Sequence, residues 1–240
     1  MLHTIPIDKI LFLDIETVPL KYRYEDLNEH ERYLFDKKVS YRIKEGVTTK
    51  DIYERAGIWA EFGKVVSIVF GIFKQTQGKR TFHIKSLAGS NEKSLLEETS
   101  RILNDFYTKK PQGYLCAHNG KEFDFPFLAR RMLINRVSLP RILKIHGKKP
   151  WETPFCDTLE LWQFGDRKHY TSLELLTEIL GITSPKNNID GSDVARIFYE
   201  ENDLHRIQEY CERDVIALAN VFLRLREEDT LKANEIIKKS

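Results

Sequence analysis

Three separated motifs in this 240-residue chain place acidic side chains beside segments that must be buried. The first motif directly follows the apolar run of residues 10–13. In chain order, the motifs are Asp14-Ile15-Glu16-Thr17, Asn119-Gly120-Lys121-Glu122-Phe123-Asp124 and Tyr210-Cys211-Glu212-Arg213-Asp214. A fold that brings the three together would build one site of converging carboxylates, which hard divalent cations prefer.

The first motif supplies two carboxylates at positions i and i+2. Residues 9–14 read as a buried strand, and residues two apart on a strand share a face. Asp14 and Glu16 would therefore repel each other unless a cation lay between them. Taken alone, an Asp-x-Glu after a strand is more often a pair of solvated charges. Only the other two motifs favour a cation site.

The third motif lies on a predicted helix that starts at Asn202 or Asp203 and reaches about residue 227. Asp214 falls inside the apolar stripe of this helix, which reads Ile207, Cys211, Asp214, Leu218, Val221 and Leu225. An unpaired buried carboxylate costs several kcal/mol or becomes neutral. A metal ion would remove that conflict. Tyr210 lies one helical turn before Asp214 and shares its face.

The second motif permits two interpretations of Asp124. It precedes a helix predicted over residues 125–135, with Pro126 in the first turn, so Asp124 could cap that helix. One carboxylate oxygen could also cap while the other faces a metal site. Phe123 could stack on a base or fill the core. Asp157, outside the three motifs, is typical of a local cap or turn former.

The remaining pattern predicts a mixed α/β fold in one domain spanning residues 1–240. Residues 19–61 read as a helical insertion, and the polar tail from about residue 229 is expected to fray. The expected strands are residues 9–14, 64–73, 80–87, 114–117 and a short one within 155–162, and the expected helices are 90–107, 125–135, 171–181, 192–199 and 202–227.

The order and spacing of the motifs resemble the DEDD 3′–5′ exonucleases of the ribonuclease H-like superfamily. Tyr210, four residues before Asp214, is similar to the tyrosine of the branch that includes the proofreading domains of family A and family B DNA polymerases. The chain most resembles predicted stand-alone exonucleases related to the family B domain, over residues 10–225. This resemblance implies a ribonuclease H-like fold, with a mixed central sheet of about five strands and helices on both faces.

The resemblance also implies an activity: two-metal-ion hydrolysis at the 3′ end of single-stranded DNA, releasing nucleoside 5′-monophosphates. Two Mg²⁺ or Mn²⁺ ions would be bound by Asp14, Glu16, Asp124 and Asp214. Tyr210 would orient the attacking water, because a phenol with an ordinary pKa near 10 is a poor base. The residues expected to contact nucleic acid are Thr17, Asn119 and Phe123.

Two alternatives remain open from the sequence. An exoribonuclease could use the same site, and a nucleic-acid-binding or polymerase-accessory module could retain it as a vestige. The expected partners are single-stranded DNA or RNA 3′ ends. Any proofreading would need a polymerase or repair partner, which the sequence does not identify.

Composition limits the remaining possibilities. The formal net charge is only +2, so attraction to phosphates must be local. Residues 130–149 contain a basic stretch that could steer a phosphate backbone or simply be solvated. The three cysteines form no CxxC pair, and the N-terminal apolar run is too short for a signal core or a membrane span. We therefore expect a cytoplasmic protein without a membrane partner.

Overall fold

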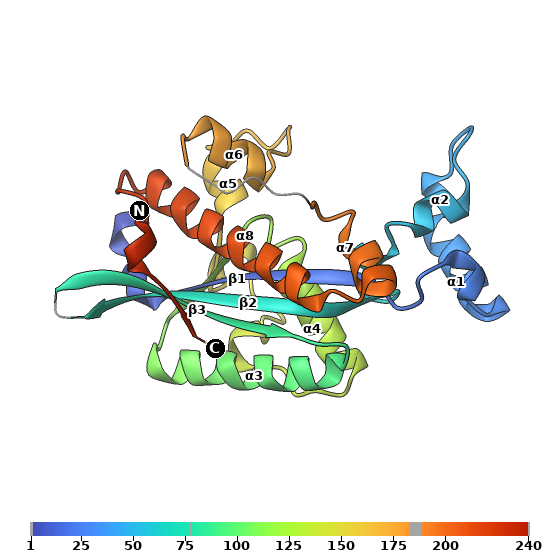
Figure 1. Ribbon diagram of the computed structural model, residues 1–240, viewed down its shortest axis with the longest axis horizontal. Helices are drawn as coiled ribbons and strands as arrows, with labels where there is room; N and C mark the ends of the chain where they lie inside the picture. Colours follow the sequence, from blue (N-terminus) through green and yellow to red (C-terminus); the bar gives the residue numbers. More distant parts are fainter. Residues whose placement is uncertain (1, 77, 183–188, 240) are drawn as a thin grey trace.

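The computed structural model describes residues 2–76, 78–182 and 189–239 (Figure 1). In this part of the chain, strands form a mixed sheet in the order β5-β4-β1-β2-β3-β6. Strand β1 lies inside the sheet, parallel to β4 and antiparallel to β2. The strands are β1 (Ile10–Pro19), β2 (Gly63–Thr76), β3 (Lys79–Ala88), β4 (Tyr114–Ala117), β5 (Phe155–Asp157) and β6 (Ile236–Lys239).

Helices cover both faces of the sheet, as predicted (Figure 1). Helices α3 and α4 lie on one face, and α5, α6 and α8 lie on the other. Helix α7 continues directly into a π-helix, Ile197–Glu201. The helices are α1 (Glu29–Val39), α2 (Thr49–Tyr53), α3 (Glu92–Lys109), α4 (Asp124–Ile134), α5 (Thr158–Gln163), α6 (Leu173–Ile179), α7 (Val194–Arg196) and α8 (Leu204–Leu225).

Strand β1 alternates between the two faces. Leu11, Leu13 and Ile15 pack in the core beneath α3 and α4. Ile10 and Phe12 pack against α8 in the opposite core. Since side chains two apart share a face, the next two positions toward α8 are Asp14 and Glu16. The strand extends to Pro19 rather than ending at Asp14 as expected, because pairing with β2 continues to Gly63. The two carboxylates therefore lie within the strand.

Helix α8 approaches the sheet closely at Gly71 of β2. A Cβ atom at this position would lie 2.2 Å from the ring of Phe82 and 2.8 Å from the side chain of Val215. Val215 is buried on α8, one residue after Asp214. The missing side chain at Gly71 therefore lets α8 pack against the sheet beside β1.

The segment between β1 and β2 forms α1, α2 and short 3-10 turns around its own small core. Phe35 and Tyr53 are buried there, with ring centroids 4.9 Å apart. The segment lies at one end of the sheet beside α7 (Figure 1). Its start is held by the phenol of Tyr199, which donates to the carbonyl oxygen of Pro19 at 2.6 Å.

The expectation that the C-terminal tail frays is wrong for residues 236–239. They form β6, which pairs in parallel with β3. This contact was not visible from local pattern because its partners are distant in sequence. Glu212 of α8 accepts from the ammonium of Lys238 at 2.5 Å, and the amide of Leu231 donates to the side chain of Asn220 at 2.8 Å. The sheet thus has one strand more than expected.

A buried ion pair joins α3, α4 and the start of β2. The carboxylate of Glu92 accepts from the Nε atom of Arg131 at 2.8 Å and from the amide of Val65 at 2.9 Å. Arg131 also donates to the carbonyl oxygen of Ala60 at 2.8 Å. Arg131 is 3% exposed, so this member of the basic stretch cannot meet a phosphate backbone. Its positive charge is paired with Glu92 inside the fold.

We expect Glu92→Ala to lower the free energy of unfolding by about 3–5 kcal/mol, because it leaves the guanidinium of Arg131 buried without its partner. Glu97→Ala is the matched control on the same helix. Glu97 is exposed and reaches only Lys93, at 4.0 Å, so its loss should change stability by less than about 0.5 kcal/mol. Urea unfolding of both variants tests this, and equal midpoints would contradict it.

Candidate active site

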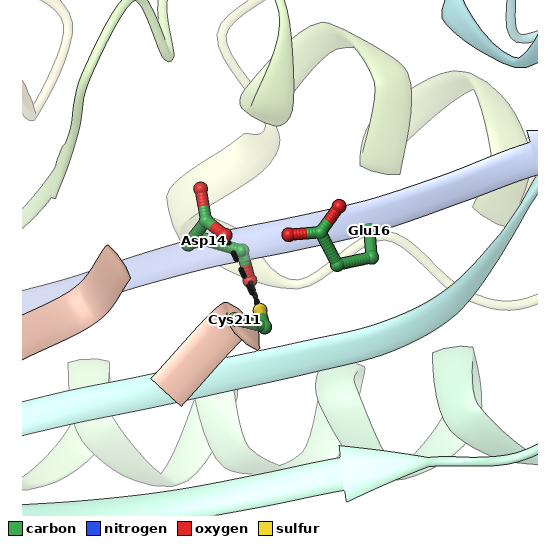
Figure 2. Close-up of side chains that lie close together, drawn as sticks. All are labelled: Asp14, Glu16 and Cys211. Atoms are coloured by element: carbon green, nitrogen blue, oxygen red, sulfur yellow. Dashed lines mark hydrogen bonds between the residues drawn. The ribbon is translucent and has the colours of Figure 1, made fainter. Parts of the chain in front are cut away.

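Two carboxylates and a thiol meet between β1 and α8 (Figure 2). One ligand atom from each of Asp14, Glu16 and Cys211 lies within 4.8 Å of the others. The thiol of Cys211 donates to a carboxylate oxygen of Asp14 at 3.3 Å. It also lies 3.4 Å from the backbone carbonyl oxygen of Asp14. The alternation of β1 and the inward stripe of α8 together produce this contact.

The carboxyl groups of Asp14 and Glu16 are poorly solvated. Burial raises the pKa of both well above the ordinary value, and the charges of Asp124 and Asp214 raise each further. Glu16 is only 7% exposed, and the charge of the neighbouring Asp14 raises its pKa further. Retaining a proton or binding a cation would relieve the repulsion between these two adjacent carboxylates, of which Glu16 is buried and Asp14 partly buried.

Asp124 reaches the same site from the start of α4. The helix begins at Asp124 itself, and the capping position before it is Phe123, so Asp124 is not the helix cap. Burial raises the pKa of Asp124 to about 7, although backbone amides of Asp124 and Ile15 donate to the carboxylate and oppose the shift. The influence of the Ile15 amide places the Asp124 carboxylate near β1.

Helix α8 supplies Tyr210 and Asp214. The phenol of Tyr210 donates to Asp214, and burial raises the pKa of Asp214 to about 6 despite this bond and the nearby Arg213. Burial also raises the pKa of Tyr210, followed by the charges of Asp214, Glu16 and Asp14. Tyr210 therefore keeps its proton at neutral pH and can act as a hydrogen-bond donor. The charges of Asp124 and Asp214 thus both act on Asp14 and Glu16, and Tyr210 lies close to Asp214, Glu16 and Asp14.

The three predicted nucleic-acid contacts occupy different positions. Asn119 follows β4 in the left-handed region, with φ of 60°, and lines a cleft of about 220 Å³. Phe123 is partly buried against the core, with its ring 5.4 Å from that of Phe127, which favours the packing role. Thr17 is half-buried on β1, directly after Glu16. Their contact with nucleic acid stays a prediction.

Asp157 is a supporting residue whose full role the sequence did not indicate. It caps α5 through the amide of Leu159 at 3.0 Å, as expected of a cap. Its carboxylate also accepts from the amides of Asn119 at 2.9 Å and Lys121 at 3.0 Å. Asp157 thereby fixes the turn between β4 and Asp124. This role follows from the arrangement of β4 and β5, which are parallel neighbours that end at the same sheet edge.

Cys211 is the other residue that sequence reasoning left out of the site. It is fully buried and free. Burial raises its pKa well above the ordinary value, and the charges of Asp14 and Glu16 raise it further. The thiol therefore keeps its proton and donates to Asp14. The sequence feature that could have indicated this role is the position of Cys211 in the apolar stripe of α8, about one helical turn before Asp214.

The donor set fits hard divalent cations. The site offers carboxylate oxygens, which Mg²⁺ and Mn²⁺ prefer, while its one sulfur stays protonated. Among the described residues, no lysine or arginine forms an ion pair with Asp14, Glu16 or Asp124. The negative charge of these three groups is therefore not neutralised by the protein.

Comparison with known proteins places the chain in a family. Residues 58–239 match the model of a family described as a predicted 3′–5′ exonuclease related to the exonuclease domain of PolB. The chain belongs to this family. The matched span contains Asp124, Tyr210 and Asp214 but not the first motif. The inclusion of Asp14 and Glu16 in the site therefore rests on the geometry of β1 and α8.

The fold is similar to that of a much larger enzyme. The family B DNA polymerase from the hyperthermophilic archaeon Pyrobaculum calidifontis matches 89% of this chain with a TM-score of 0.55 and 14% sequence identity. The match covers 24% of the polymerase chain. The predicted ribonuclease H-like fold is thus confirmed. No curated protein sequence matched the chain. Within the described residues, no helix is long and apolar enough to cross a membrane.

We expect metal-free protein to lose stability as the pH rises. The folded-state pKa values of Asp124, about 7, and Asp214, about 6, lie above their ordinary value of 3.8. Groups with raised folded pKa values contribute stability that is complete below about pH 4 and is lost as pH rises through the folded values. In EDTA, Asp124→Asn should therefore gain Tm relative to wild type between about pH 5 and 8.

Thermal unfolding of both proteins across this pH range checks the expectation. Mn²⁺ should restore the Tm of the wild type at pH 8, because a cation compensates the ionised carboxylates. A Tm difference between variant and wild type that does not change with pH would contradict the proposed repulsion.

Proposed function

We propose that this protein is a metal-dependent 3′–5′ exonuclease that hydrolyses single-stranded DNA from its 3′ end and releases nucleoside 5′-monophosphates. One observation carries the proposal: Asp14 and Glu16 of β1 meet Cys211 of α8, and the charges of Asp124 and Asp214 act on both carboxyl groups. Among the described residues, no lysine or arginine forms an ion pair with Asp14, Glu16 or Asp124. Membership of a family of predicted 3′–5′ exonucleases supports the polarity. Similarity to part of a DNA polymerase supports a nucleic-acid substrate.

Asp14, Glu16, Asp124 and Asp214 would hold two divalent cations, Mg²⁺ or Mn²⁺. Such ions activate water as a nucleophile and stabilise charge on a leaving oxygen. The protein contributes the fixed positions of these ligands. Cys211 holds the carboxylate of Asp14 by donating its thiol proton, and the amide of Ile15 holds that of Asp124. Preorganised ligands of this kind need little rearrangement during reaction.

Tyr210 has the properties of a positioning group rather than a general base. Its raised pKa keeps the phenol protonated, and its bond to Asp214 fixes its orientation. A protonated phenol can donate or accept one hydrogen bond but cannot remove a proton from water at neutral pH. We therefore assign to Tyr210 the orientation of the attacking water. Asn119, at the edge of the adjoining cleft, would contact the substrate strand.

A vestigial binding module is the rival from another functional class. Such a module would gain stability by replacing any of the four carboxylates, because burial raises the pKa of each. Their joint presence instead favours a working site. The match spans about a quarter of the polymerase chain, so the polymerase activity itself is not carried over to this protein. Whether the substrate sugar is deoxyribose or ribose is decided by experiment.

We expect Asp14→Asn and Asp214→Asn each to reduce cleavage by several orders of magnitude, because each removes a ligand charge from the metal site. Degradation of 3′- and 5′-labelled DNA and RNA oligonucleotides, with and without Mn²⁺, measures the activity and its polarity. Asp105→Asn, an exposed carboxylate on α3, is the matched control and should retain wild-type activity.

Full activity in excess EDTA, or in either site variant, would exclude the proposed metal site. Digestion of RNA but not DNA would make the protein an exoribonuclease. Asp214→Asn should keep the wild-type fold in thermal unfolding, so that its inactivity reports lost chemistry rather than lost structure.

Tyr210→Phe removes one hydroxyl and keeps the ring. If the phenol orients water, the single-turnover rate should fall roughly ten- to a thousand-fold, in the range of lost positioning or transition-state hydrogen bonds. Mn²⁺ affinity should barely change, because the phenol is not a proposed ligand. An unchanged rate would remove Tyr210 from the mechanism, and a rate restored only by much higher Mn²⁺ would assign it to metal binding.

A further inference from the structure

The loop between α5 and α6 exposes aromatic and basic side chains in one short segment, Phe164-Gly165-Asp166-Arg167-Lys168-His169-Tyr170. Phe164 is 86% exposed and Tyr170 is 65% exposed. Phe164 also has a left-handed backbone, with φ of 45°, which is uncommon for a residue with a bulky side chain. Folding normally buries rings of this size, so two exposed rings within seven residues suggest a surface that meets a ligand.

Hydrogen bonds hold the end of this loop against the strand that leads to the active site. One ring nitrogen of His118 lies 2.8 Å from the carbonyl oxygen of Thr171, and the other lies 2.9 Å from the hydroxyl of Thr158. The His118 ring also meets Tyr170, with centroids 6.2 Å apart. His118 directly precedes Asn119 at the end of β4. The loop is therefore anchored to the second acidic motif.

The loop forms one wall of the cleft beside the site. Arg167, His169 and Tyr170 line this cleft of about 220 Å³ together with Asn119 and Asp157. The cleft also approaches the carboxylates: desolvation raises the pKa of the Tyr170 phenol, and the charges of Asp124 and Asp157 raise it further. The loop thus lines a cleft whose Tyr170 lies within the electrostatic influence of Asp124, one of the proposed metal ligands.

The charges around the cleft leave the loop's cations available. Among the described residues, neither Arg167 nor Lys168 forms a side-chain ion pair. Of the acidic groups lining the cleft, Glu160 pairs with Lys121 at 2.5 Å, and Asp157 is held by three backbone amides. Glu122 is the remaining acidic lining residue. The free cations of the loop can therefore attract phosphates locally, although the chain is nearly neutral overall.

We propose that residues 164–170 form a platform for single-stranded nucleic acid, on which Phe164 and Tyr170 stack against bases while Arg167 and Lys168 contact phosphates. Aromatic rings interleaved with basic side chains are suited to single strands, because every base has a face that can stack and every nucleotide a phosphate. Stacking also tolerates different sequences, as a degradative enzyme requires. This inference rests on the proposed exonuclease function and names the surface that holds its substrate.

Affinity measurements on loop variants test the platform. Fluorescence anisotropy of a labelled single-stranded 12-mer, measured in EDTA to prevent cleavage, reports the Kd. Phe164→Ala and Tyr170→Ala should each weaken binding roughly five- to a hundred-fold, the range expected for one lost base–aromatic stack. Tyr41→Ala is the matched control, since Tyr41 is 72% exposed on the segment between β1 and β2, and it should bind as the wild type does.

The salt dependence of binding separates phosphate contacts from stacking. Arg167→Gln should reduce the slope of log Kd against log salt concentration by about one and should weaken binding to all sequences equally. Tyr170→Ala should leave this slope unchanged. Equal slopes for wild type and Arg167→Gln would remove Arg167 from the platform.

Photocrosslinking locates the strand directly. A single-stranded oligonucleotide containing 5-iododeoxyuridine should crosslink to residues 164–170, and mass spectrometry identifies the peptide. Crosslinks confined to the basic stretch of residues 130–149, or wild-type affinity in both aromatic variants, would overturn the platform and point to a protein partner for these rings. If wild-type protein digests the oligonucleotide in that case, the exonuclease proposal stands. A wild type that neither binds nor digests single strands would overturn both.

Discussion

Repulsion among buried carboxylates is the constraint around which this structure is arranged. Asp14 and Glu16 occupy the face of β1 that Ile10 and Phe12 fill with apolar contacts to α8. Asp214 approaches from α8, and the charges of the group raise one another's pKa values. The surrounding cores must therefore supply enough stability to hold like charges together. A divalent cation bound there would gain binding energy from relief of this repulsion.

Buried carboxylates elsewhere in the protein show how differently a structural acid is treated. Glu92 has a guanidinium and a backbone amide, and Asp157 has three amides. Each such group is compensated by partners that the protein itself provides. Among the residues that the structure describes, Asp14, Glu16 and Asp124 form no ion pair with a lysine or arginine, and Arg213 lowers the pKa of Asp214. This contrast, more than acidity itself, distinguishes a site for a cation from ordinary buried ion pairs.

Features set by local pattern could be predicted from the sequence. The spacing of Asp14 and Glu16, and of Tyr210 and Asp214, fixed which residues share a face, because strand and helix periods are constant. Features that depend on distant partners could not. The pairing of β6 with β3, the burial of Arg131 and the three amides at Asp157 each join segments far apart in the chain. Cys211 was visible in the apolar stripe, but its contact with Asp14 required the packing of α8 on β1.

Contacts to Glu212 help to set the orientation of α8. This residue lies between Cys211 and Asp214 but points to the other side of the helix, where Ser86 donates to it at 2.6 Å and Gln208 at 3.1 Å. The ammonium group of Lys238 on β6 also donates to the carboxylate of Glu212. Helix α8 contacts β1 through Cys211 and β3 through Glu212. Rotating the helix about its axis would break one of these contacts. Through Lys238, β6 therefore adds to the contacts that set the rotation of α8 about its axis, on which the directions of Tyr210 and Asp214 depend.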